Sequence, residues 1–224
     1  MQRSYKVGTR ASYLALKQVE EISQKLKKFY PEISLEAVKI DTYGDKDKLT
    51  PISEIEGSDF FTQSIDAALL KGEIDFAVHS AKDLPDELPR GLKIAAITAS
   101  LALEDVLISK KGLKLNALSQ GARVGTSSLR RKEQLKKYRS DFKIVDIRGT
   151  ILERLALLDN GSSVNLDAII IAKAGLMRLG LQNRITQELP LTIVKPHPLQ
   201  GALALVVKAE NKELADVLKV LDKK

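Results

Sequence analysis

Apolar residues in this chain form helical stripes and short continuous runs that alternate along the sequence. The first stripe is spaced by three and four residues, and it predicts one face of a helix that opens at residues 9–12 and runs to about Tyr30. Its members are Ala15, Val19, Ile22, Leu26 and Phe29. Strands predicted at residues 5–8 and 35–40 flank this helix, so the chain opens with a β-α-β unit.

The next segment predicts a long polar loop, a helix and a buried strand. Residues 42–57 are polar and contain Gly and Pro, which favours a loop, and residues 60–70 carry a second helical stripe. The apolar run 74–78 is typical of a strand buried on both faces. Pro85 and Pro89 prevent that strand from continuing, and residues 92–98 predict another strand.

The second half repeats this opening pattern. Residues 123–129 resemble residues 6–13, because each has a strand, a Val-Gly-Thr turn, a serine and then a helix. The elements predicted after this second turn are a helix at 129–138, a strand at 142–147, a helix at 150–158, a strand at 168–172 and a helix at 174–179.

The repeat predicts two similar doubly wound α/β domains. The first contains residues 1–99 with 200–224, and the second contains residues 100–199. Hinges are expected at residues 99–104 and 194–200. The apolar run 202–207 is predicted to return as a strand to the first sheet, followed by a terminal helix.

The amino-acid composition limits the kinds of ligand and site that we expect for this chain. With 4% aromatic residues and no tryptophan, the core must be aliphatic, and a net charge of +7 favours anionic partners. No basic stripe interleaved with aromatic residues is present, so nucleic acid is not expected. Because the sequence contains no Cys, disulfides and thiol nucleophiles are excluded. With no Cys and only two His, a metal site is not expected. Without a leader or a membrane-length apolar run, we expect a cytoplasmic protein that does not bind membranes.

A polar cluster follows the buried strand 74–78. It contains His79, Ser80, Lys82 and Asp83, at the sheet edge where α/β proteins bind ligands. A basic and an acidic side chain side by side could hold an anion and move a proton. The alternative is a solvated turn in which Asp83 is only a local cap.

Arginines gather near the two Val-Gly-Thr turns, where exposed helix N-termini favour anions. We expect them to converge on a crevice between the domains and to bind carboxylates or phosphates with paired hydrogen bonds. They are Arg10, Arg130, Arg131, Arg148 and Arg154. Each could instead be a surface side chain, and four hydroxyl residues could be simple helix caps. Those residues are Thr9, Ser12, Ser127 and Ser128.

Six segments, in this order, resemble the porphobilinogen deaminase (hydroxymethylbilane synthase) family over essentially the whole chain. They are Gly8-Thr9-Arg10-Ala11-Ser12, His79-Ser80-Ala81-Lys82-Asp83-Leu84-Pro85, Gly125-Thr126-Ser127-Ser128-Leu129-Arg130-Arg131, Ile147-Arg148-Gly149, Leu158-Asp159-Asn160-Gly161 and Ala174-Gly175-Leu176-Met177-Arg178-Leu179-Gly180-Leu181. The resemblance implies two domains arranged as in type II periplasmic binding proteins, with the active site in the interdomain cleft.

The resemblance implies an enzyme of tetrapyrrole (haem) biosynthesis. Four porphobilinogen molecules would lose ammonia and join head to tail into hydroxymethylbilane, primed on a dipyrromethane cofactor. Asp83 matches the catalytic aspartate, which contacts pyrrole N–H groups and stabilises the cation left by ammonia. The matches to carboxylate-binding positions are Arg10, Ser12, Lys82, Ser128, Arg130, Arg131, Arg148 and Arg154. Secondary candidates are Thr9, Phe61, Ser80, Thr126, Ser127, Arg178 and Gln200. Expected partners are porphobilinogen and linear oligopyrroles, bound by a monomer.

The chain departs from the family in several places. The family has a third domain whose cysteine anchors dipyrromethane, whereas this sequence is expected to stop before that domain and contains no Cys. Smaller differences fall at residues 58–60, at Tyr13 and at residues 198–199. Three interpretations follow: a naturally short enzyme that holds its primer non-covalently, a shortened form of a longer enzyme, or a non-catalytic binder of pyrrole carboxylates or another small polyanion.

Overall fold

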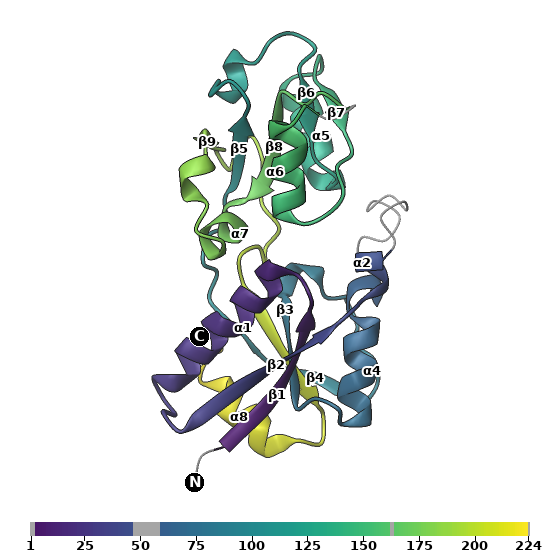
Figure 1. The fold of residues 1–224 in the computed structure, drawn as a ribbon, viewed down its shortest axis with the longest axis vertical. Coiled ribbons are helices and arrows are strands. Elements are labelled where there is room, and N and C mark those ends of the chain that lie inside the picture. The colour runs from purple at the N-terminus through teal and green to yellow at the C-terminus, as the bar shows by residue number, and fades with distance from the viewer. Residues whose placement is uncertain (1–2, 47–58, 162–163, 224) are drawn as a thin grey trace. The chain divides into compact units, whose positions relative to one another are not determined.

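The computed structural model describes residues 3–46, 59–161 and 164–223 (Figure 1). These residues divide into two compact units. Unit 1 contains residues 3–46, 59–101 and 201–223, and unit 2 contains residues 102–161 and 164–200. The chain therefore passes from unit 1 to unit 2 and back again. Most of the predicted loop at residues 42–57 lies outside the described residues; its described start contains the short helix α2 (Tyr43–Lys46).

Unit 1 is a five-stranded sheet with helices on both faces (Figure 1). Across the sheet, its strands are β2 (Ile33–Ile40), β1 (Arg3–Arg10), β3 (Phe76–Ser80), β10 (Leu203–Lys208) and β4 (Leu92–Ile97). β1 is parallel to β2 and β3, whereas β10 is antiparallel to both of its neighbours. Helices α1 (Tyr13–Lys27) and α8 (Lys212–Lys219) pack on one face, and α4 (Gln63–Lys71) packs on the other.

Unit 2 repeats this plan. Its strand order is β7 (Lys143–Val145), β6 (Arg123–Gly125), β8 (Ala168–Ala172), β5 (Asp105–Ser109) and β9 (Gln187–Glu188). β6 is parallel to β7 and β8, and β5 is antiparallel to β8. Helix α5 (Leu129–Tyr138) covers one face, and α6 (Ile151–Asp159) and α7 (Lys173–Arg178) cover the other. In both units the antiparallel strand follows directly after the chain arrives from the other unit.

Short 3₁₀ turns complete the fold. They are η1 (Asp59–Phe61), η2 (Ala81–Asp83), η3 (Leu115–Ala117) and η4 (Gln182–Arg184).

Several predictions of local structure need correction. The strand predicted at residues 142–147 is shorter, because β7 contains only Lys143–Val145. The first helix starts at Tyr13, because β1 extends to Arg10 and Ser12 caps the helix. It ends at Lys27, which leaves Phe29 beyond the buried face and 58% exposed. The helix predicted at residues 60–70 is split into η1 and α4. Strand β3 extends to Ser80, so His79 lies within the sheet and not in the loop after it.

Two glycines make the repeated Val-Gly-Thr turns possible. A Cβ atom on Gly8 would lie 2.2 Å from Cδ1 of Ile74, and one on Gly125 would lie 3.0 Å from side-chain carbons of Ile147 and Ile169. Each glycine lies on the central parallel strand of its unit, where isoleucines pack directly against the backbone. A side chain at either position would therefore overpack the core.

We expect Gly8→Ala to lower the free energy of unfolding by about 1–3 kcal/mol, because the new methyl group must displace Ile74. Urea unfolding followed by circular dichroism measures this. Ile74→Val removes the clashing Cδ1 atom and should cost about 0.5–1.5 kcal/mol alone. The double variant should then lose less than the sum of the two single losses; full additivity would contradict the packing explanation.

Candidate functional site

A small pocket of about 70 Å³ lies within unit 1, where β1 and β3 end and α1 begins. The predicted site residues that line it are Thr9, Arg10, Ser12, Phe61, His79, Ser80 and Asp83. Since β1 and β3 are parallel neighbours, their C-terminal ends meet at one edge of the sheet. Lys82, in the same predicted cluster, is half-buried but is not among the lining residues.

Arg10 and Ser12 bring hydrogen-bond donors to this pocket. Ser12 is the N-cap of α1, and its hydroxyl oxygen accepts a hydrogen bond from the backbone N–H of Ala15 at 3.2 Å. Its own proton can still be donated, so the capping role and a binding role are compatible. The Arg10 guanidinium lies over the Phe61 ring, 4.5 Å from its centroid, which restrains this cation beside the pocket.

Gln18 is a pocket residue that the sequence analysis missed. It is buried in α1, and its amide nitrogen donates to the Ser80 hydroxyl oxygen at 2.9 Å. The bond orients Ser80 and leaves the Ser80 proton available for another acceptor. The signal was present in the sequence, because Gln18 is a polar residue within the apolar stripe between Ala15 and Val19.

His79 is the most unusual group in the pocket. It is 5% exposed, and its Nε2 atom has no hydrogen-bond partner within the described part of the chain. Burial, with a further contribution from the positive charge of Arg10, lowers the pKa of His79 to about 4. The imidazole is therefore neutral at physiological pH. An unsatisfied buried polar atom costs about 1–3 kcal/mol, so the fold tolerates this arrangement at some cost.

Asp83 is placed by the turn that follows β3. The backbone N–H of Ala81 donates to the carbonyl of Ala202 at 3.0 Å, which fixes the start of η2 beside β10. Asp83 ends this turn with an exposed side chain that lines the pocket. Thr9, by contrast, is fully buried, and its hydroxyl lies 3.5 Å from the carbonyl oxygen of Ala15. Thr9 therefore ties β1 to α1.

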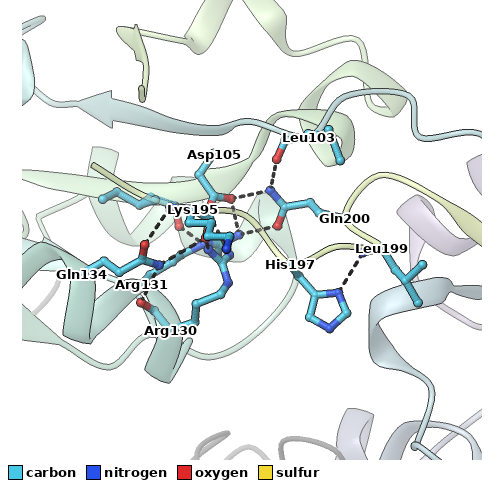
Figure 2. Close-up of polar contacts among 10 residues, drawn as sticks. Leu103, Asp105, Arg130, Arg131, Gln134, Lys195, His197, Leu199 and Gln200 are labelled. Atoms are coloured by element: carbon cyan, nitrogen blue, oxygen red, sulfur yellow. Dashed lines mark hydrogen bonds and ion pairs between the residues drawn. The ribbon is translucent and has the colours of Figure 1, made fainter. Parts of the chain in front are cut away.

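Two of the predicted arginines of unit 2, Arg130 and Arg131, converge on a carboxylate of the chain itself (Figure 2). Asp105, the first residue of β5, is fully buried; its two oxygens accept from Arg131 at 2.7 Å and from Arg130 at 3.0 Å. Burial alone would raise the pKa of Asp105, but the two guanidiniums oppose it and hold the pKa below its usual value. Two cations and one anion leave this cluster one net positive charge.

Gln200 completes the cluster and joins it to the segment through which the chain leaves unit 2 (Figure 2). Its amide nitrogen donates to Asp105 at 2.9 Å and to the carbonyl of Leu103 at 2.6 Å. The Arg130 guanidinium and the Gln134 amide also donate to the carbonyl of Lys195. The entering and leaving segments of unit 2 are thus tied together at one buried carboxylate.

The remaining predicted residues of unit 2 differ in role. Ser127 is structural, because its hydroxyl donates to the carbonyl of Ile147 and accepts from the backbone N–H of the same residue. Ser128 precedes α5 and makes no side-chain capping bond. Thr126 is fully buried and its hydroxyl lacks a partner among the described residues. Arg154 donates through Nε to the carbonyl of Gly149 at 2.9 Å.

Arg148 and Arg178 are half-buried, and their predicted binding roles remain predictions, as does the expected crevice between the domains. Sequence reasoning did not find Asp105. An acidic residue directly before the apolar run 106–108 was the available signal.

Among the described residues, no helix is long and apolar enough to cross a membrane. Within the same ranges, no three His, Asp or Glu side chains are grouped so that they could hold a metal ion.

Comparisons with known proteins agree with the resemblance seen in the sequence. Residues 5–216 match the family profile described as "Porphobilinogen deaminase, dipyromethane cofactor binding domain". The chain is 44% identical over 217 residues to the porphobilinogen deaminase of Natranaerobius thermophilus, covering 97% of this chain and 69% of that protein. It is 46% identical over 218 residues to that of Brevibacillus brevis, covering 97% and 70%. The chain belongs to the porphobilinogen deaminase family. Members of this family are transferases of tetrapyrrole biosynthesis that act on porphobilinogen and oligopyrroles.

Solved structures place this porphobilinogen deaminase homologue in a wider fold class. The methionine binding protein MetQ matches with a TM-score of 0.58 at 15% identity, covering 97% of this chain and 89% of that chain. The regulatory domain of MexT from Pseudomonas aeruginosa matches with a TM-score of 0.54 at 14% identity, covering 99% and 98%. At such identities the likeness concerns the fold alone. The predicted class, two α/β domains of the type II periplasmic-binding-protein kind, is confirmed.

We expect Asp105→Asn to destabilise unit 2 by about 3–5 kcal/mol, because it leaves two guanidiniums without their buried carboxylate. Urea unfolding followed by circular dichroism measures the loss. Glu213→Gln is the control, since it breaks an ion pair with Arg3 in which both side chains are largely exposed, and it should leave stability near that of the wild type. Equal effects of the two substitutions would contradict a structural role for Asp105.

Two buried groups should give unit 1 opposing pH dependences. The folded-state pKa of His79, about 4, lies below its ordinary 6.5, so its stability contribution is present above pH 6.5 and is lost as pH falls through 4. Asp66 is 2% exposed, and burial raises its pKa from 3.8 to about 6. The stability contribution of Asp66 is present below pH 3.8, where its carboxyl group is protonated, and is lost as pH rises through 6.

Single substitutions should separate these two contributions. Between pH 7 and 4.5, about the range in which both groups titrate, His79→Gln should become more stable on acidification, and Asp66→Asn should become less stable. Each contribution is at most about 3 kcal/mol. Urea unfolding at several pH values tests this, and identical pH slopes for the wild type and both variants would refute the assignment.

Proposed function

We propose that this chain is a hydroxymethylbilane synthase, which condenses four porphobilinogen molecules head to tail with loss of ammonia. One observation carries the proposal: Asp83 lines the same small pocket of unit 1 as Arg10 and Ser12. The reaction creates a cation on a pyrrole ring whose side arms are carboxylates. A carboxylate placed beside carboxylate-binding groups supplies both of the charges that such a substrate needs.

Asp83 is assigned the stabilisation of the cationic pyrrole. When ammonia leaves, the C–N bond breaks with its electron pair on nitrogen, and the positive charge remains on the ring. The next pyrrole carbon then attacks the methylene carbon to form the C–C bond, and that pyrrole carbon loses its proton to water, which restores both aromatic rings. A carboxylate about 4 Å away is worth about 4 kcal/mol at an effective dielectric of 20, or about three decades of rate. In bulk water the same pair is worth about 1 kcal/mol. Because Asp83 is exposed without substrate, the bound pyrrole must displace water from it.

The positive groups are assigned to the acetate and propionate arms. In unit 1, Arg10 is restrained by Phe61, and the hydroxyl protons of Ser12 and Ser80 can be donated to a carboxylate. Hydrogen bonds to charged groups contribute roughly 1.5–3 kcal/mol each. In unit 2, the net positive charge of the Asp105 cluster favours the same kind of ligand. Lys82, Ser128, Arg148 and Arg154 are assigned to further arms.

A dipyrromethane primer fits the donors of the unit 1 pocket, because its side arms are also carboxylates. Arg10, Ser12 and Ser80 are the groups that would hold it there. When bound, the primer supplies the pyrrole end to which the first substrate unit is joined. This 224-residue sequence contains no cysteine, so its own residues offer the primer non-covalent contacts and no thioether anchor.

Incubating the protein with porphobilinogen should release ammonia and yield uroporphyrin, with and without an added linear pyrrole primer. Asp83→Asn should lower turnover by about three decades, because the cation loses its counter-charge, while porphobilinogen affinity stays close to that of the wild type. Ammonia release and calorimetric binding measure the two effects. Asp86→Asn is the matched control, since Asp86 is an exposed carboxylate in the same segment that does not line the pocket.

Binding of porphobilinogen without any turnover, even with primer present, would identify the protein as a pyrrole-carboxylate binder. Equal losses of binding and turnover in Asp83→Asn would instead give Asp83 a structural role.

A further inference from the structure

The Nε2 atom of His79 is a hydrogen-bonding group that nothing in the described structure uses. Buried polar atoms are normally paired, and an exception in a native fold calls for an explanation. His79 is 5% exposed, its Nε2 atom has no partner among the described residues, and the residue lines the pocket that also contains Asp83 and Arg10. An unused polar atom at a candidate binding pocket points to a ligand that completes it.

The ionisation state of His79 limits what it can do. Its pKa is lowered to about 4 by burial and, second, by the nearby Arg10 cation. The side chain is therefore a neutral imidazole at pH 7, with one N–H group and one nitrogen lone pair. It can act as a hydrogen-bond acceptor, which a protonated histidine cannot.

The other pocket groups indicate which part of a ligand meets His79. Arg10 is a donor, and Ser12 and Ser80 already accept hydrogen bonds from Ala15 and Gln18, so their protons remain for an anionic ligand. Donors for carboxylates are thus well supplied. Among the lining side chains, the acceptor groups that carry no proton are the Asp83 carboxylate, the Gln18 amide oxygen and one nitrogen of the neutral His79 imidazole. A pyrrole ring carries one donor, its N–H group.

We propose that Nε2 of His79 accepts a hydrogen bond from the N–H group of a pyrrole ring bound in the unit 1 pocket. The inference rests on the proposed function, because it requires a pyrrole ligand. It gives His79 a direct binding role beside Asp83. It also explains why Nε2 is unpaired in the free protein, because its hydrogen bond forms only when a ligand is bound.

Histidine-selective nitrogen NMR tests this directly, because the chain contains only two histidines. His197 lies in unit 2, where its Nδ1 atom accepts from the backbone N–H of Leu199 at 3.1 Å, and it serves as the internal control. The probe is a porphobilinogen analogue with a methyl group in place of the aminomethyl group, which cannot lose ammonia. On titration, the unprotonated Nε2 resonance of His79 should move saturably toward lower frequency, and the ring nitrogen resonances of His197 should not move.

Substitutions at His79 provide a second measurement. A ligand-binding role and a purely structural role of this residue predict different changes in the unfolding midpoint. His79→Met keeps the side-chain bulk and removes the acceptor, so it should weaken analogue binding about 2- to 12-fold. Because Nε2 is unpaired in the free protein, the same change should leave the unfolding midpoint unchanged or higher. A purely structural histidine would lower the midpoint. His79→Gln is the matched control, since its amide oxygen can reach the Nε2 position and should preserve affinity within about threefold.

The outcomes separate this inference from the proposed function. If the wild type releases ammonia and binds the analogue in calorimetry, but the His79 resonance does not move, the inference is wrong and the proposed function stands. A Nε2 atom that carries a proton in the complex likewise overturns it. If the wild type neither binds the analogue nor releases ammonia from porphobilinogen, both proposals are wrong.

Discussion

Parallel pairing of the central strand in each unit is the constraint on which the rest of the structure depends. In unit 1, β1 lies between β2 and β3 and is parallel to both; in unit 2, β6 lies between β7 and β8 and is parallel to both. The carboxyl ends of such strands meet at one edge of the sheet. Residues distant in sequence, such as Arg10 and Asp83, are brought to one pocket by this geometry.

The sequence was sufficient to predict most elements, because the chain is locally consistent. The helix at residues 129–138 and the strand at residues 168–172 have the bounds expected from their apolar patterns. The run near residues 202–207 returns to the first sheet as predicted. Errors fell at the boundaries of elements. Phe29 continues the stripe by spacing, but the helix ends before it, so its side chain faces water.

Many residues of the candidate site could be predicted from the sequence, but the hydrogen bonds and ion pairs between them could not. Periodicity and turn residues located Ser12 and Asp83, since these depend on local geometry. Partners separated by many residues have no such signature. Nothing in the local pattern connects Asp105 with Arg131, or Gln18 with Ser80. As a result, two arginines expected to bind a ligand carboxylate were found paired with a buried carboxylate of the chain, and the glutamine that orients Ser80 was missed.

The position of β10 has a consequence for folding during synthesis of the polypeptide chain. This strand comes from the end of the chain yet lies between β3 and β4, which are made much earlier. A ribosome would therefore finish all of unit 2 while the sheet of unit 1 still lacked the strand between β3 and β4. Because domains usually fold as units during synthesis, unit 2 is positioned to fold first. Until then, the exposed edges of β3 and β4 are where a nascent chain would need protection from aggregation.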